Sequence, residues 1–414
     1  MHEATQRRLL RCGFLLLCVL PTLGVVSWAC VWSLPGHTAR LEQQLRNRLG
    51  AIVRIDRVTH LRPGKMRLDH LQLIDPETRQ PLAKIQSLEW QHTNTALQLT
   101  GTQATVPHDQ WRRLWSLLQD RVLHQDVLHG RSAAMSFDQL TIETKAEPFQ
   151  LYDLDGALYH EQTTWCADLR MQPQQNSSQP PLQISVRRER ASEQPVTRLR
   201  IDTHSQSVSL PFLPESMHRR LCPNPAFHGM LSVTCDHGSW NGHMAGTLER
   251  VDLKAFVTPQ LPYRLDVAVN LEIAEAEFGP AGLEQARGRC TATSGTIGRS
   301  LVRSLVAHHF GSAGEALTDR TDEDHDVSVQ QLNLDWQISD KGLTLRGSCP
   351  ADRAKEPAQQ VAIVCDQGPL WIGPWHPTVH LEYLVRALVP PDLPDAHVIA
   401  RRIQRRLPRA APTL

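Results

Sequence analysis

The feature that most constrains the fold is a two-residue alternation of apolar and polar side chains, repeated in short segments along the 414 residues. It is clear in 182–188 (LQISVRR), 196–203 (VTRLRIDT) and 327–339 (VSVQQLNLDWQIS). Successive side chains of a β-strand point to opposite faces, so each segment predicts a strand with one apolar and one polar face. Sheets with one solvated face are antiparallel. The chain is therefore predicted to be mainly β and antiparallel.

A few helices interrupt the strands. Apolar side chains recur at helical spacing in four places, and no strand–helix–strand rhythm appears, so a doubly wound nucleotide-binding fold is disfavoured. The first helix carries Leu41, Leu45 and Leu49 and stops at Gly50. The other three carry the apolar sets Trp111, Leu114, Trp115, Leu118 and Val122; Ile297, Leu301, Val302, Leu305 and Val306; and Leu381, Leu384, Val385 and Leu388.

Residues 13–34 contain no charged side chain. About 20 apolar residues cross a hydrocarbon core as a helix, so this run predicts a single transmembrane helix. Pro21 and Gly24 are tolerated in such helices, and Trp28 and Trp32 suit a membrane interface. The alternative is a cleaved signal peptide, against which the length of the run argues. The arginines before the run favour a cytoplasmic N-terminus, with the rest of the chain extracytoplasmic.

Four segments follow from these patterns. Residues 1–34 form a cytoplasmic tip and the transmembrane helix, and 35–130 a membrane-proximal helix, a β-meander and a second helix. Residues 131–395 form an extended antiparallel β region with inserted helices, and 396–414 a basic C-terminal helix or tail.

Composition and motifs exclude several classes of function. With 44 Lys and Arg against 43 Asp and Glu, the chain lacks the basic excess of a nucleic-acid-coating protein. It has no P-loop, GxGxxG, HExxH or GxSxG motif, so no catalytic residue, cofactor site or metal site is predicted. The 20 histidines are scattered, and the adjacent pair His308 and His309 makes a poor chelate on a helix. The acidic run 322–326 lacks the pattern of a calcium loop and indicates a solvated loop.

Six of the nine cysteines lie outside the apolar run, which permits disulfides in an oxidising compartment. The alternative is that each is a small buried apolar side chain. If one bridge exists, Cys349–Cys365 is the first candidate, because the two residues would flank one hairpin.

The tail is basic, with Arg401, Arg402, Arg405, Arg406 and Arg409. One interpretation is contact with anionic lipid headgroups or with an acidic partner. The other is a solvated basic face on a helix docked through Ile399, Ile403 and Leu407.

Two blocks carry a family resemblance. The apolar run followed by 41–88, with its Pro63-Gly64 turn and its Asp75-Pro76 turn before Pro81-Leu82-Ala83, resembles the opening of AsmA-like envelope proteins. The segment 327–349 resembles that family's recurring hairpin, and the chain is also similar to membrane proteins of planctomycete-type bacteria. The resemblance implies an elongated, curved antiparallel sheet that forms an apolar β-groove, anchored to the inner membrane.

The resemblance also implies a function, which is moving lipid or assisting assembly of the envelope. We therefore expect a non-catalytic, single-pass protein of the bacterial cell envelope that shelters the acyl chains of a phospholipid cargo. The alternative is a structural scaffold whose groove is plugged by the helices at 111–122 and 297–306. An envelope enzyme ranks third, because the catalytic motifs are missing.

Overall fold

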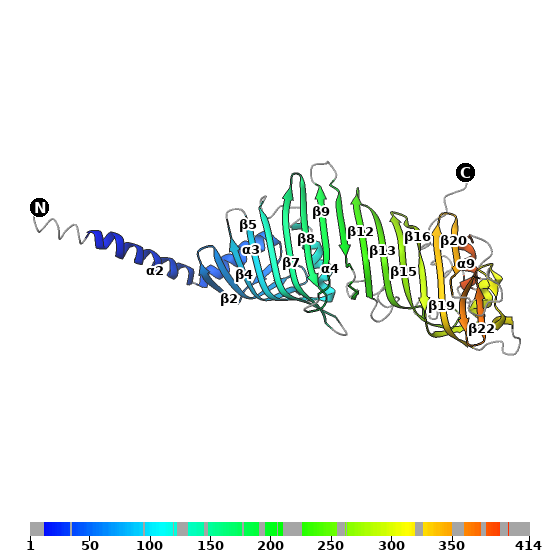
Figure 1. The fold of residues 1–414 in the computed structure, drawn as a ribbon. Coiled ribbons are helices and arrows are strands. Elements are labelled where there is room, and N and C mark those ends of the chain that lie inside the picture. The colour runs from blue at the N-terminus through cyan, green and yellow to red at the C-terminus, as the bar shows by residue number, and fades with distance from the viewer. Residues whose placement is uncertain are drawn as a thin grey trace, which may run out of the picture. The chain divides into compact units, whose positions relative to one another are not determined.

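The computed structural model describes residues 12–33, 35–93, 96–118, 120–121, 131–144, 148–175, 178–189, 195–204, 206–209, 226–254, 261, 263–318, 326–349, 360–373, 378–389 and 396. The chain divides into two compact units, Met1–Tyr159 and His160–Leu414. Strands dominate the described residues of both units (Figure 1), which confirms the prediction of a mainly β chain.

The first unit begins with helical backbone that differs from the predicted transmembrane helix. A π-helical stretch, η1 (Leu15–Val19), precedes a 14-residue α-helix, α2 (Leu20–Ser33). Pro21 lacks the amide hydrogen that would bond the Leu17 carbonyl, and it stands in the first turn of α2, where that bond is not needed. No helix among the described residues is both long and apolar enough to cross a membrane. The prediction of one spanning helix over 13–34 is therefore wrong.

The predicted leucine-faced helix is confirmed as α3 (Pro35–Leu49). It ends at Gly50, whose φ of +70° is readily adopted by glycine, and whose amide donates to the Arg46 carbonyl at 2.8 Å. Leu45 is buried, and Leu41 and Leu49 pack beside it. The helix covers one face of the adjoining strands by contact with Val53, Ile55, Leu68, Leu71 and Leu88.

The described residues of the first unit form the strands β1 (Ile52–Arg54), β2 (Arg57–Arg62), β3 (Lys65–Ile74), β4 (Pro81–His92), β5 (Ala96–Pro107), β6 (Ser132–Glu143) and β7 (Phe149–Glu161), the last of which ends two residues beyond the boundary at Tyr159. β3 pairs with β1, β2 and β4, and β4 pairs with β5, all antiparallel. This is the predicted β-meander, with a turn at Pro63-Gly64.

One pairing departs from the antiparallel prediction. β5 and β6 are parallel, with Ala96 opposite Ser132 and Pro107 opposite Glu143. Parallel neighbours need a crossover of a dozen or more residues, and the chain between 107 and 132 supplies it. The sheet of the first unit is therefore mixed, because a helix-containing excursion returns the chain to the starting end of β5.

That excursion contains the helix predicted around Trp111. It consists of a 3₁₀ turn, η2 (His108–Gln110), and a short α-helix, α4 (Trp111–Leu118), which packs on β4. Leu114 is buried, and Trp111 and Leu117 are partly buried against Ala51, Leu82, Ala83 and Val106. The helix is a core element of its unit, as predicted, but among its described side chains Leu114 rather than a tryptophan is the most buried. Val122 lies outside the described residues.

The turn between β3 and β4 is held by a buried carboxylate, Asp75, whose side chain is only 6% exposed. Asp75 accepts hydrogen bonds from the Glu77 amide at 3.1 Å and the Thr78 hydroxyl at 2.8 Å, and it pairs with Arg113 of α4. Burial acts to raise the pKa of Asp75, but the hydrogen bonds from Arg113, Glu77 and Thr78 together lower it below its ordinary value. The turn and α4 are thus joined through one charged group.

The substitution Asp75→Asn should reduce the free energy of unfolding at pH 7 by about 1 kcal/mol, because it removes the charge that Arg113 binds. The folded-state pKa is depressed, so this stabilisation is present above about pH 4 and is lost as the pH falls through the folded-state pKa. Urea denaturation at pH 7 and pH 3 should show the difference between wild type and variant shrinking at the lower pH. Glu77→Gln is the control, since Glu77 is 78% exposed, and should have a smaller effect. A difference that grows toward pH 3 would contradict this account.

The second unit is built around a run of long strands. In neighbour order these are β8 (Thr164–Gln172), β9 (Leu182–Glu189), β10 (Thr197–Asp202), β12 (Ala226–Asp236), β13 (Ser239–Asp252), β15 (Ala268–Gly279), β16 (Gly282–Ala292) and β19 (Asp326–Ser339). Every one of these pairings is antiparallel, as predicted. β20 (Gly342–Gly347) and β21 (Val361–Cys365) both pair with β19. The remaining strands are β11 (Val208–Ser209), β14 (Leu265–Asp266), β17 (Gly295–Gly298), β18 (Ser312–Ala313) and β22 (Gly368–Ile372).

The helices of the second unit gather near its C-terminal strands. α7 (Arg299–Ala307) contacts β17, β18 and α9 (Leu381–Leu388), while α8 (Glu315–Thr318) contacts β18 and β22. Their apolar faces join a large core that contains Leu301, Val302, Phe310, Leu370 and Trp371. The two predicted helices are confirmed as α7 and α9, but Ile297, predicted to lie on the face of the first, is instead a buried residue of β17. The predicted basic helix at 396–407 lies outside the described residues, except for position 396.

Candidate functional site

The strand register of the second unit aligns apolar side chains across nine strands. Each residue of this set is the direct cross-strand partner of the next, so their side chains share one face of the sheet. We call the set the apolar row; it consists of Leu169, Ile184, Ile201, Leu231, Met244, Ala276, Ala286, Ile338 and Leu343. It runs from β8 to β20 and contains no polar side chain.

The adjacent register position gives the opposite result. A polar row crosses seven strands on the other face, and consists of Asp168, Ser185, Arg200, Ser232, His243, Glu277 and Gln285. Ion pairs accompany it on this face, including Arg187–Asp168 at 2.8 Å, Arg287–Glu275 at 3.0 Å and Arg289–Asp335 at 2.6 Å. The two rows follow directly from the two-residue alternation of the sequence, and they give this part of the sheet one apolar and one polar face.

The apolar row is covered unevenly. Leu343 is buried, and Ile338 packs against the C-terminal core beneath the helices. Ala276 and Ala286 are buried among larger neighbours, which include Phe278, Leu283 and Trp336. From β8 to β13, however, Leu169, Ile184, Ile201, Leu231 and Met244 are all only half-buried. This half-exposed part of the apolar row is the candidate binding surface.

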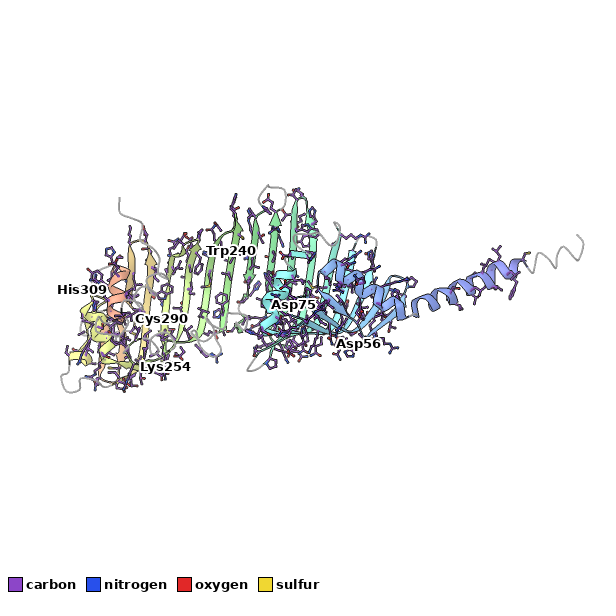
Figure 2. The ribbon with its side chains drawn as sticks, turned by 180° about the vertical axis from the view of Figure 1, so that it is seen from behind. Asp56, Asp75, Trp240, Lys254, Cys290 and His309 are labelled. Atoms are coloured by element: carbon purple, nitrogen blue, oxygen red, sulfur yellow. The ribbon has the colours of Figure 1, made fainter. Side chains whose placement is uncertain are left out.

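An exposed tryptophan stands at the edge of this surface. Trp240 is 55% exposed and lies beside the β12–β13 turn (Figure 2), directly opposite Cys235. Both residues are in register with the apolar face, because Trp240 and Met244 are an even number of residues apart on one strand. The surface thus includes a large aromatic side chain at the end of its strands.

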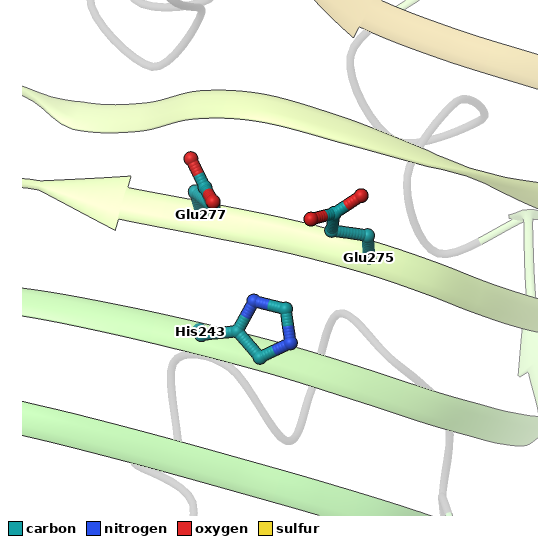
Figure 3. Close-up of side chains that lie close together, drawn as sticks. All are labelled: His243, Glu275 and Glu277. Atoms are coloured by element: carbon teal, nitrogen blue, oxygen red, sulfur yellow. The ribbon is translucent and has the colours of Figure 1, made fainter.

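A second candidate site lies on the polar face (Figure 3). His243 on β13 is the direct partner of Glu277 on β15, and Glu275 projects from the same strand two residues earlier. One ligand atom from each of the three side chains lies within 4.8 Å of the other two. Sequence reasoning predicted no metal site and missed this group. The spacing of Glu275 and Glu277 is visible in the sequence, but only the register identifies the histidine opposite them.

Other residues singled out from the sequence do not come together as a site. His308 Nδ1 lies 2.8 Å from the Ser304 carbonyl, whereas the His309 ring packs edge-on against Tyr383, so the pair does not converge. Arg401–Arg409 and the acidic residues at 322–325 lie outside the described residues.

The proposed bridge Cys349–Cys365 is absent, and both cysteines are free and buried. Cys349 pairs with the backbone of Val361, whereas Cys365 lies at the β21–β22 turn four residues further along the strand. The two thiols donate instead to carbonyls, those of Ala362 at 3.4 Å and Gly368 at 3.2 Å.

Comparison with protein-family models, with curated proteins and with solved structures finds no match for this chain.

The alkylation rates of two cysteines on the apolar face should show that one end of this face is more buried than the other. Burial raises the pKa of Cys290 on β16 to about 11, so about one thiol in a thousand is ionised at pH 8. Cys235 is partly buried and lies opposite the exposed Trp240 at the end of β12. At pH 8, iodoacetamide should modify Cys290 at least tenfold more slowly than Cys235, as measured by peptide mass spectrometry. Unfolding in urea should equalise the two rates, and equal rates in the folded protein would contradict the assignment.

Proposed function

We propose that this chain is a non-catalytic, AsmA-like protein of the bacterial cell envelope that shelters lipid acyl chains against its apolar row. The observation that carries the proposal is the half-exposed stretch of that row between β8 and β13. A contiguous set of apolar side chains that the rest of the fold leaves only partly buried, with the exposed Trp240 at its edge, is a candidate site of interaction.

The dimensions of the row favour an acyl chain as its occupant. Strands are about 4.8 Å apart, so the four spacings from β8 to β13 cover about 19 Å. One leaflet of a bilayer has a hydrocarbon thickness of about 15 Å, half of the bilayer core. An extended acyl chain therefore fits along the half-exposed row, across the strands. Each methylene that it buries contributes about 0.8 kcal/mol.

The polar face supports the same orientation. Arg187–Asp168 and Arg287–Glu275 are ion pairs that would lose hydration without gain if lipid tails covered them. Lipid is thus directed to one face of the sheet, and the polar face is left to water.

The N-terminal segment supports a location at the membrane. Its apolar side chains are exposed, with Leu17 at 75%, Val25 at 65% and Leu16 at 64%. Contact with the hydrocarbon of a bilayer would remove this surface from water. We propose that the segment holds the chain at the inner membrane, with the β units on the extracytoplasmic side, as the resemblance to AsmA-like proteins implies. Anionic headgroups as partners of Arg401–Arg409 remain part of this proposal.

A charged side chain in the apolar row should weaken lipid binding. Leu231→Lys places an ammonium group on the half-exposed surface and should lower the affinity for a fluorescent hexadecanoic acid at least tenfold. Ser232→Lys is the matched control, because the neighbouring residue faces the polar side, and it should stay within twofold of wild type. Affinity should also rise with chain length, by up to about fourfold per methylene.

Native mass spectrometry of detergent-extracted protein should show co-purifying phospholipid in wild type and the control variant. Circular dichroism checks that both variants fold. Equal effects of the two substitutions, or no binding by folded wild type, would overturn the proposal. The latter result would favour the scaffold alternative, in which α4 and α7 cover the apolar faces of their own units and no lipid is bound.

A further inference from the structure

We propose that His243, Glu275 and Glu277 form a divalent-metal site on the polar face, with Zn²⁺ as its ion. The three residues come from two hydrogen-bonded strands, so the backbone holds them at fixed separation. His243 and Glu277 are direct cross-strand partners, and Glu275 shares their face because it lies two residues from Glu277. Figure 3 shows the three side chains gathered over the β13–β15 pair.

The chemistry of the set suits zinc. Zn²⁺ binds imidazole nitrogen and carboxylate oxygen at about 2.0–2.2 Å, so tetrahedral ligand atoms lie about 3.4 Å apart. The three ligand atoms here already lie within 4.8 Å of one another. Glutamate side chains rotate about three bonds, and small rotations bring their oxygens to the ion. Mg²⁺ and Ca²⁺ prefer all-oxygen sets, so the histidine selects against them.

Two neighbours on β16 orient and balance the carboxylates. Gln285 Nε2 donates to Glu277 Oε2 at 2.5 Å, and Arg287 Nη2 pairs with Glu275 Oε2 at 3.0 Å. Such outer contacts fix the direction of metal ligands. With neutral histidine, two carboxylates and one guanidinium leave a net charge of −1, which a dication reverses. Arg287 is 64% exposed and is thus free to turn toward water when the ion binds.

The place of the site on the sheet indicates its role. The β13–β15 pairing shifts register twice, between Met244 and Gly246 and between Leu248 and Val251. A metal bound to both strands would clamp the ladder beside the first shift. Met244 and Ala276 of the apolar row directly adjoin His243 and Glu277 in sequence. The site is therefore a structural clamp beneath the apolar face, and it stands independently of lipid binding.

Calorimetric titration of the full, EDTA-treated chain with ZnCl₂ tests the proposal. Wild type should bind one equivalent of Zn²⁺ that is lost, or weakened at least tenfold, in His243→Ala and in Glu277→Gln. His228→Ala is the matched control, because His228 lies on the same face but beside a single carboxylate, Glu249, at 3.3 Å. It should leave binding unchanged.

Two further readouts separate the clamp from other effects. Co²⁺ should give a visible absorption band in wild type and not in His243→Ala, and Zn²⁺ should raise the Tm of wild type but not of Glu277→Gln. Circular dichroism establishes that each variant is folded, and Glu275→Gln replaces any variant that is not. Zinc affinity in folded His243→Ala that stays within tenfold of wild type, or tenfold excess Ca²⁺ that displaces Zn²⁺, would overturn the proposal.

Discussion

The two-residue period of the extended chain is the constraint on which the second unit depends. Because cross-strand partners share a face, one register position carries Leu231 and Met244, and the next carries Ser232 and His243. If any one strand slipped by one residue, its polar-row side chain would move to the apolar face and stand in the apolar row. The apolar row and the ion pairs of the polar face thus stabilise the same register from opposite sides.

What differs along the chain is the cover over the apolar side. In the first unit, α3 and α4 bury Leu45 and Leu114 against the strands. At the C-terminal strands of the second unit, α7 supplies Leu301 and Val302 to the core. Leu248 and Leu271 pack against both this core and the cluster around Ile273. The apolar face is therefore continuous from the buried C-terminal core to the partly buried surface between β8 and β13. The decrease in burial along this face distinguishes the candidate binding surface from ordinary core.

Much of this fold could be predicted from local sequence. Strand alternation, the leucine face of α3, its stop at Gly50 and the helix faces of α7 and α9 depend on residues a few positions apart. Features set by distant partners could not be predicted. The parallel β5–β6 pair depends on how the chain returns after α4, and the separation of Cys349 from Cys365 depends on the register of β21. The N-terminal prediction rested on hydropathy, which does not show that the helical backbone changes from the π-helical η1 to the 14-residue α2 within this run.

The candidate sites divide in the same way. Each strand's apolar side could be recognised in the sequence, but the alignment of nine such residues into one row required the register. His243 likewise gains meaning only from its partner Glu277.

Photolabelling with a diazirine-bearing hexadecanoic acid tests the central claim most directly. Mass spectrometry should find label on Ile201, Leu231 and Met244, with little on Arg200, Ser232 and His243. Equal labelling of the two sets, or label confined to the polar set, would contradict the account.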